Sequence, residues 1–264
     1  MLWLEAETAD GVVGLGETFY AAEAVEAYIH ANLAPIVLGM SAVDIEAVYC
    51  RTRPYVGFVA ASTELRARSA LDIALWDALG KVTGQPISVL LGGRIRSQIP
   101  VYNTCAGNQY VRGTKLGTTE NFGISSSGTD QNYEDLDRFL NDPVGLAGSL
   151  LDMGIDSMKI WPFDFAAEAT QGQFISPAEL NKALAPFEAI KKEYGDRMQI
   201  SAELHGMWNL SESLIICQAL DEIGMRWIED PVFLTNPTGI QELKRTVRSR
   251  IAMGETRGGA DDFK

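Results

Sequence analysis

The sequence predicts an α/β protein whose larger part is a parallel β-sheet flanked by helices. After residue 98, short apolar segments rich in β-branched or bulky residues recur, and helical stretches near 177–194, 210–223 and 237–248 separate the later ones. Regular alternation of strands and helices is typical of βαβ units and a parallel sheet, and the repeat length is about that of one unit of a (β/α)8 barrel.

The first part of the chain carries signals for a hairpin followed by helices. An Asp-Gly turn at 10–11 separates two alternating segments, which predicts a β-hairpin over residues 2–16. Apolar positions at i, i+3 and i+4 then predict helices. These helices span residues 21–32, ending before Pro35, then 42–51 and 60–81, with a helical turn and glycine stop at 86–93.

Five apolar segments in the second part are predicted strands. They are residues 99–102, 157–161, 198–203, 226–229 and 250–255. Residues 112–132 are rich in Gly, Ser, Thr and Asn and are predicted to form a long loop after the first of these strands.

Composition excludes several classes of protein. The 264 residues carry a formal net charge of −13, which argues against nucleic-acid binding because a phosphate backbone would be repelled. No apolar run reaches the roughly 18 residues of a membrane span, and the acidic amino terminus does not read as a signal peptide, so we expect a cytoplasmic protein with no membrane partner. The three cysteines are far apart and are predicted to be buried free thiols.

Three predicted strands end in glutamate. Glu229 follows Glu203 by 26 residues, and Glu255 follows Glu229 by the same interval. Because the carboxyl ends of neighbouring parallel strands converge at one edge, these side chains are expected to meet there. Three carboxylates repel one another unless a cation joins them, and oxygen-only ligands favour Mg²⁺, Mn²⁺ or Ca²⁺ over zinc. The alternative is that the glutamates are helix caps or solvated groups.

Several segments resemble the mandelate racemase/muconate lactonising enzyme family of the enolase superfamily. WIEDP at 227–231 and MGET at 253–256 resemble its second and third metal-ligand motifs, and RSALDIALWDALGK at 68–81 resembles its helix signature. The resemblance covers essentially the whole chain. It implies an amino-terminal α+β capping domain over residues 1–98 and a modified (β/α) TIM barrel, incomplete at the carboxyl end, over residues 99–264.

The resemblance also implies a chemistry. Members of this family abstract the proton α to a carboxylate and stabilise the resulting enolate with Mg²⁺, which Glu203, Glu229 and Glu255 would bind here. A small-molecule carboxylate is then the expected partner, and a homo-oligomer the expected assembly. The first ligand of the family is usually Asp, so Glu203 is one methylene longer, a difference that can shift the ion or change its coordination.

The choice of reaction depends on residues near these ligands. Many racemases of the family carry Lys-x-Lys on the second strand, whereas this chain has Lys159-Ile160-Trp161. The absent second lysine argues against a two-base racemase. Lys159 is expected to polarise the substrate carboxylate, and a salt bridge to a metal ligand is its alternative role.

His205 points to dehydration. Glu203-Leu204-His205-Gly206 resembles the Asp-x-His-Gly of galactonate dehydratases and the Asp-x-His of mannonate dehydratases, in which this histidine protonates the departing hydroxyl. Imidazolium is a good proton donor near neutral pH, whereas hydroxide is a poor leaving group. A histidine that only hydrogen-bonds the loop is the alternative.

The sequence therefore predicts an acid-sugar dehydratase of the aldonate type. Trp161, Trp208 and Tyr55 are candidate substrate contacts, Tyr55 (or Arg53) from the capping domain. Strand signals stop at five, so the general base is expected beyond residue 264. Two alternatives stay open: a racemase or epimerase of a 2-hydroxy acid, and a non-catalytic metal-binding fragment.

Overall fold

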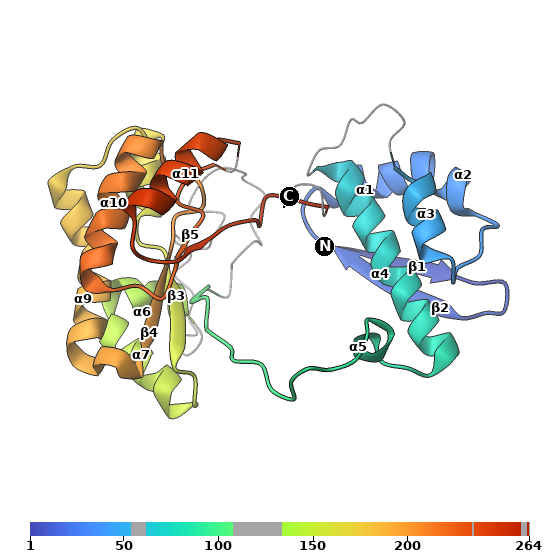
Figure 1. Cartoon of the computed structure of the whole chain (residues 1–264), viewed down its shortest axis with the longest axis horizontal. Helices are drawn as coiled ribbons and strands as arrows, with labels where there is room; N and C mark the ends of the chain where they lie inside the picture. Colours follow the sequence, from blue (N-terminus) through green and yellow to red (C-terminus); the bar gives the residue numbers. More distant parts are fainter. Residues whose placement is uncertain (54–61, 108–133, 234, 260–262, 264) are drawn as a thin grey trace. The chain divides into compact units, whose positions relative to one another are not determined.

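The structure, a computed structural model, describes residues 1–53, 62–107, 134–233, 235–259 and 263 (Figure 1). The chain folds as two compact units. The first comprises Met1–Ile99 with Thr256–Lys264, and the second comprises Pro100–Glu255. The first is built of a hairpin and helices and the second of helices and a parallel sheet, so the predicted fold class, an α+β cap and a TIM-barrel-like domain, is confirmed.

The first unit is an antiparallel hairpin packed on one long helix. Strand β1 (Leu2–Glu7) pairs with β2 (Val13–Thr18), and α4 (Thr63–Thr83) lies against them. The other helices are α1 (Ala22–Tyr28), a π-helix (Ile29–Leu33), α2 (Ala34–Val37), α3 (Ile45–Arg51) and α5 (Ile87–Leu90). Apolar residues of α1, α3 and α4 form its core, among them Val25, Val48 and Leu71.

The prediction that the first helix stops before Pro35 is wrong. The chain stays helical through the π-helix and on into α2, where Pro35 occupies the first turn. Pro35 has no backbone N–H to donate to the preceding turn, and the wider π-turn before it leaves room for its ring. The extra residue of a π-turn allows the chain to continue without a break.

Small residues set the close approach between β2 and α4. Ala70 and Ala74 of α4 are fully buried, and a Cβ added at Gly16 would overlap the carbonyl oxygen of Ala70. Gly14 meets the Ala74 carbonyl oxygen in the same way. The backbones can pack at this distance only because both strand positions lack a side chain.

Replacing Gly16 with Ala is therefore expected to lower the free energy of unfolding by about 1–3 kcal/mol, since the helix must move to make room. Urea denaturation followed by circular dichroism measures this change. Leu15→Ala is the control, because Leu15 is 40% exposed and lies beside Gly16 in β2. Equal effects of the two substitutions would contradict the packing explanation.

The second unit contains a four-stranded parallel sheet with strand order β3-β4-β5-β6. Its strands are β3 (Ser157–Ile160), β4 (Gln199–Glu203), β5 (Ile228–Glu229) and β6 (Ile251–Ala252). Figure 1 shows the helices of this unit gathered along one side of the sheet. They are α6 (Asp135–Asn141), α7 (Pro143–Asp152), α8 (Asp164–Thr170), α9 (Pro177–Tyr194), α10 (Leu210–Ile223) and α11 (Pro237–Thr246).

Helices α9, α10 and α11 lie where the sequence predicts them, and each begins with a side-chain cap. Ser176 and Glu179 form a capping box at α9, while Asn209 and Asn236 accept backbone hydrogen bonds at the starts of α10 and α11. The sequence analysis did not predict α6, α7 or α8.

The predicted strand at 99–102 does not form. Ile99 is 74% exposed and Val101 61% exposed, so these apolar side chains gain no buried face that would hold them in the sheet. Pairing is limited to Asn103, whose backbone N–H donates to Ser157 and whose carbonyl accepts from Lys159. The β-bridge to β3 therefore begins one residue beyond the predicted strand.

The cysteines and the helices bear on two features considered in the sequence: thiol burial and membrane-spanning segments. Cys105 and Cys217 are buried free thiols as predicted, whereas Cys50 is free but exposed. No described helix combines the length and the apolar character that crossing a membrane requires.

Candidate active site

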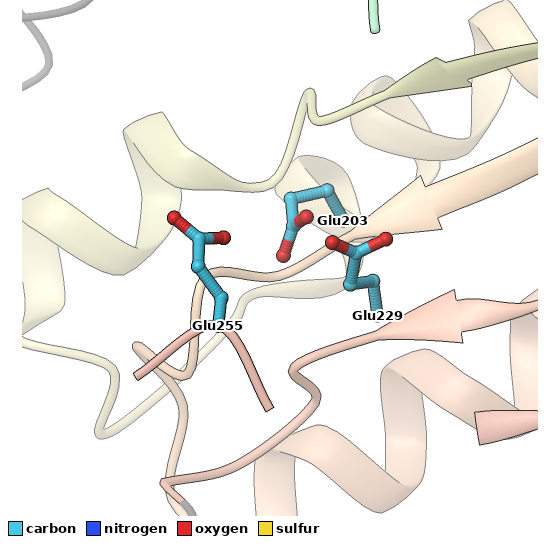
Figure 2. A group of neighbouring side chains, drawn as sticks. All are labelled: Glu203, Glu229 and Glu255. Atoms are coloured by element: carbon cyan, nitrogen blue, oxygen red, sulfur yellow. The ribbon is translucent and has the colours of Figure 1, made fainter. Parts of the chain in front are cut away.

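Three glutamates converge at the carboxyl end of the sheet (Figure 2). Glu203 ends β4, Glu229 ends β5, and Glu255 lies in the segment after β6. One carboxylate oxygen from each lies within 4.8 Å of the others. Glu203 is 1% exposed, whereas Glu255 is on the surface, so the cluster opens from a buried end to an accessible one.

The register explains two of these positions and corrects the third. Glu203 is the register partner of Glu229, as their equal spacing predicts. The partner of Glu229 on β6 is Ala252, and Glu255 follows three residues later. Glu255 therefore reaches the cluster from a loop and not from an equivalent strand position.

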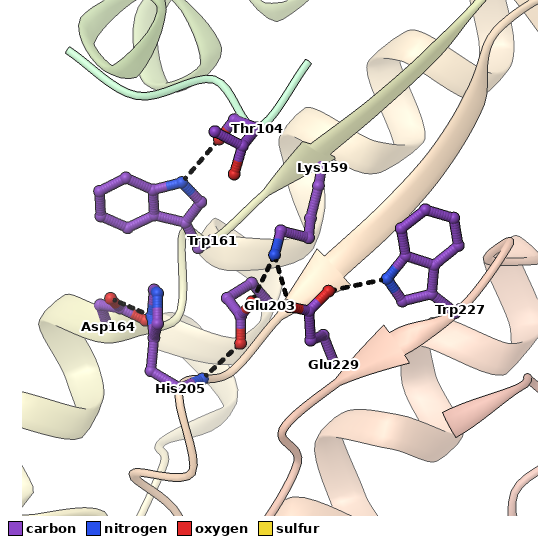
Figure 3. Close-up of polar contacts among 8 residues, drawn as sticks. All are labelled: Thr104, Lys159, Trp161, Asp164, Glu203, His205, Trp227 and Glu229. Atoms are coloured by element: carbon purple, nitrogen blue, oxygen red, sulfur yellow. Dashed lines mark hydrogen bonds and ion pairs between the residues drawn. The ribbon is translucent and has the colours of Figure 1, made fainter. Parts of the chain in front are cut away.

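Lys159 on β3 supplies the positive charge of the cluster (Figure 3). Its Nζ lies 2.7 Å from Glu203 Oε2 and 2.7 Å from Glu229 Oε1. Burial works against the ammonium form, but the two carboxylates outweigh it and raise the pKa of Lys159 well above its usual value. The lysine is therefore protonated, and its charge keeps two closely spaced carboxylates compatible with burial.

Burial acts unequally on the two carboxylates. It raises the pKa of Glu203 to about 7 despite the positive groups nearby, whereas the pKa of Glu229 is lowered, because hydrogen bonds from Lys159 and Trp227 outweigh partial burial. A second positive charge among these groups would favour the ionised form of Glu203.

Trp227 is a residue that the sequence analysis did not select. Its indole N–H donates to Glu229 Oε2 at 3.0 Å. Its ring contacts the Tyr102 ring edge-on, with the ring centroids 5.1 Å apart. With Lys159 on Oε1 and Trp227 on Oε2, both oxygens of Glu229 have a donor. The signal was available, since Trp227 lies two residues before Glu229 and side chains at that spacing share a face of a strand.

His205 lies beside the cluster, just after β4. Its backbone N–H donates to Glu203 Oε1 at 3.0 Å, and its Nδ1 lies 2.9 Å from Asp164 Oδ2. The ring of Trp161 meets the imidazole edge-on, with centroids 5.5 Å apart. Burial lowers the pKa of an imidazole, but Asp164 outweighs it and, with Glu203 and Glu255, raises the pKa of His205 to about 9.

Asp164 is the second residue that the sequence analysis missed. It is the first residue of α8, five positions after Lys159, and its side chain is fully buried. Burial raises the pKa of its carboxyl, and the His205 imidazole opposes that shift. An aspartate directly after the apolar run Ile160–Phe163 was a visible signal, because a buried acid needs a partner.

The structure describes two of the three predicted substrate contacts, Trp161 and Trp208, and their role stays a prediction. Trp161 is 2% exposed, its indole N–H donates to the Thr104 carbonyl at 3.3 Å, and its ring contacts the His205 imidazole. Trp208 is also 2% exposed and packs in the core of the second unit. Tyr55 lies outside the described residues. A cavity of about 440 Å³ borders Glu229 and Glu255 and is also lined by Tyr102, Trp227 and Met253.

The donor set fits a hard divalent cation. Glu203, Glu229 and Glu255 offer only carboxylate oxygens. Opposite ligands around Mg²⁺ are about 4 Å apart, so a small inward movement of the flexible side chains would bring these oxygens, now within 4.8 Å of one another, to the separation that Mg²⁺ requires. The position between Glu203 and Glu229 already holds a positive charge, the Lys159 ammonium. Fold and cluster thus define an α/β protein of the barrel type with a strand-end site that can hold a metal.

Comparison with known proteins gives the family. Residues 1–92 match the mandelate racemase/muconate lactonizing enzyme N-terminal domain, and residues 144–264 match the family described as enolase C-terminal domain-like. A solved enolase of the mandelate racemase subgroup from Agrobacterium tumefaciens superposes with a TM-score of 0.83 at 38% identity, covering 99% of this chain and 61% of that one. The chain belongs to the mandelate racemase/muconate lactonizing enzyme family of the enolase superfamily.

Curated relatives differ in their reactions. A D-mannonate dehydratase of Novosphingobium aromaticivorans is 27% identical over 256 residues, an alignment that covers 96% of this chain and 60% of the relative. Muconate cycloisomerase 1 of Pseudomonas putida is 24% identical over 271 residues, covering 99% of this chain and 60% of the relative. The chain thus spans about 60% of the length of these two relatives.

Proposed function

We propose that the protein is a Mg²⁺-dependent acid-sugar dehydratase that converts an aldonate or a related polyhydroxy acid to a 2-keto-3-deoxy acid. The observation that carries the proposal is the placement of His205 directly beside three converging carboxylates, with its backbone N–H on one of them. The name of the D-mannonate dehydratase relative supports the same class of reaction.

Each residue has a role in this proposal. Glu203, Glu229 and Glu255 would hold Mg²⁺, the ion that enolase-superfamily members use, and the ion would supply charge that stabilises an enolate. Lys159 lies among the same carboxylates, where its ammonium group neutralises charge and can face a substrate carboxylate.

The proposed dehydration involves two proton transfers, one from the α-carbon and one to the leaving hydroxyl. The α-proton leaves to a base, the enolate forms, and its electrons expel the hydroxyl at the neighbouring carbon. His205 gives that hydroxyl a proton, so water leaves and an enol remains that becomes the 2-keto acid. We assign the base to no residue of the described part of the chain.

His205→Asn is expected to lower kcat for dehydration by about 10²–10⁴-fold, since the leaving hydroxyl loses its acid. The assay incubates the natural-length gene product with Mg²⁺ and a panel of aldonic and aldaric acids and measures 2-keto-3-deoxy products. His30→Asn is the matched control, because His30 is the other histidine of the chain and lies exposed in the first unit.

Other outcomes would redirect the assignment. Exchange of the α-proton into deuterium without any keto product would support a racemase or epimerase of a 2-hydroxy acid. Activity that survives EDTA would contradict the metal's role. A protein with neither activity, in which Glu229→Gln changes no metal affinity, would be a non-catalytic remnant.

A further inference from the structure

Asp164 is a buried acidic residue that neither the proposed cation site nor the proposed proton transfer requires. Its side chain is fully buried at the start of α8. Burying a carboxylate is unfavourable unless a hydrogen bond or an opposite charge compensates. Packing alone therefore does not explain why an acidic side chain is buried at this position.

Helix capping does not supply that reason. A carboxylate in the first turn of a helix commonly accepts backbone N–H groups. Within the described residues, neither Asp164 oxygen accepts a hydrogen bond from a backbone N–H. The attractive partner of the carboxylate there is His205, whose Nδ1 lies 2.9 Å from Oδ2.

The imidazole of His205 is only partly buried. His205 Nδ1 is buried, yet the His205 side chain is 20% exposed. Nε2 is the ring nitrogen that is not in this contact with Asp164. Figure 3 shows the Asp164 carboxylate on one side of the ring and the Glu203 carboxylate near the backbone of the same residue.

Two further contacts restrict the same ring. The backbone of His205 is left-handed, with φ of 50°, which is uncommon for histidine, and its N–H is held by Glu203. Trp161 contacts the imidazole edge-on and is itself anchored by its hydrogen bond to Thr104. The Glu203 and Trp161 contacts thus restrain the backbone and the ring of His205, and the Asp164 contact restrains the same ring at Nδ1.

We propose that Asp164 is a positioning residue that binds His205 through Nδ1 and so presents Nε2 as the proton-donating nitrogen. This inference rests on the proposed function, in which His205 is the acid. A carboxylate behind an imidazole selects which nitrogen faces the reaction and stabilises the proton on the other one.

The first test observes the contact without any activity. The natural-length gene product is labelled with 15N-histidine, and the His205 signals are identified by their loss in His205→Asn. We expect a strongly deshielded ring proton bonded to Nδ1, lost in Asp164→Asn and kept in Glu168→Gln, the matched control one turn further along α8. A proton that is absent in the unmodified protein, or that survives Asp164→Asn, would overturn the proposal.

The second test separates positioning from structural damage. Asp164→Asn is expected to lower kcat for dehydration by about 10–100-fold with little change in KM, while α-proton exchange into deuterium is kept as in His205→Asn. Loss of exchange together with dehydration would indicate a structural role and overturn the proposal. If His205→Asn keeps a normal kcat while the signal of the Nδ1 proton still depends on Asp164, the proposed role of His205 as the acid is wrong, but the contact between Asp164 and His205 is supported.

Discussion

Replacing Glu229 with Gln is expected to weaken Mg²⁺ binding by at least about tenfold, since losing a partner outside the ligand shell of a metal already costs that much. The substitution removes the charge from the central carboxylate of the cluster, the one that contacts Lys159 and accepts the Trp227 N–H. It also leaves a neutral amide in place of one of three convergent oxygen donors. Titration calorimetry with MgCl₂ on metal-stripped protein measures the affinity.

The control for this substitution is Glu188→Gln. Glu188 lies exposed on α9 and is not one of the clustered glutamates, and replacing it removes the same charge from the protein. Its Mg²⁺ affinity should match that of the unmodified protein. A Glu229→Gln protein that binds Mg²⁺ as tightly as Glu188→Gln would show that the glutamate cluster is not the site.

Lys159→Met is expected to lower the free energy of unfolding by roughly 2–4 kcal/mol when no divalent cation is present. The substitution leaves Glu203 and Glu229 without their shared counter-charge, and Glu203 is almost fully buried. Proton uptake by Glu203, whose pKa is already raised to about 7, limits the loss. Saturating Mg²⁺ should narrow the difference in stability between Lys159→Met and the unmodified protein. In the variant the cation replaces the missing counter-charge of Glu203 and Glu229, and a cation bound only by the folded protein stabilises it.

Lys191→Met provides the matched comparison in urea denaturation. Lys191 pairs with Asp196 at the same 2.7 Å distance, but the Asp196 side chain is 99% exposed. An exposed ion pair contributes roughly 0–1 kcal/mol, so this substitution should change stability little. Equal losses in the two variants would contradict the view that burial of the carboxylates gives Lys159 its importance.

Strand–helix alternation predicted the fold class, and equal spacing predicted that glutamates would meet. The spacing argument held for Glu203 and Glu229 because both end paired strands, whereas Glu255 reaches the cluster from a loop whose path the interval does not specify. Apolar composition alone placed a strand at 99–102, although strand formation depends on a buried face that this segment does not have.

The two missed residues share a physical cause. Each contacts another side chain of the site: Asp164 contacts His205, which a different segment supplies, and Trp227 contacts Glu229, two residues further on, through a contact that depends on its rotamer. The sequence offered a signal for each of these two residues, but the side chain that each one contacts is known only from the folded structure. Identification of Tyr55 as a substrate contact stays a prediction, since it lies outside the described residues.

The central claim is that Glu203, Glu229 and Glu255 bind one divalent cation. A crystal structure of the protein grown with MnCl₂, with anomalous data collected for manganese, tests it most directly. The account predicts one strong anomalous peak with an oxygen of each glutamate about 2.0–2.3 Å away and the Lys159 ammonium displaced from between Glu203 and Glu229. A map with no peak among these carboxylates, at a manganese concentration that saturates binding in solution, would contradict it.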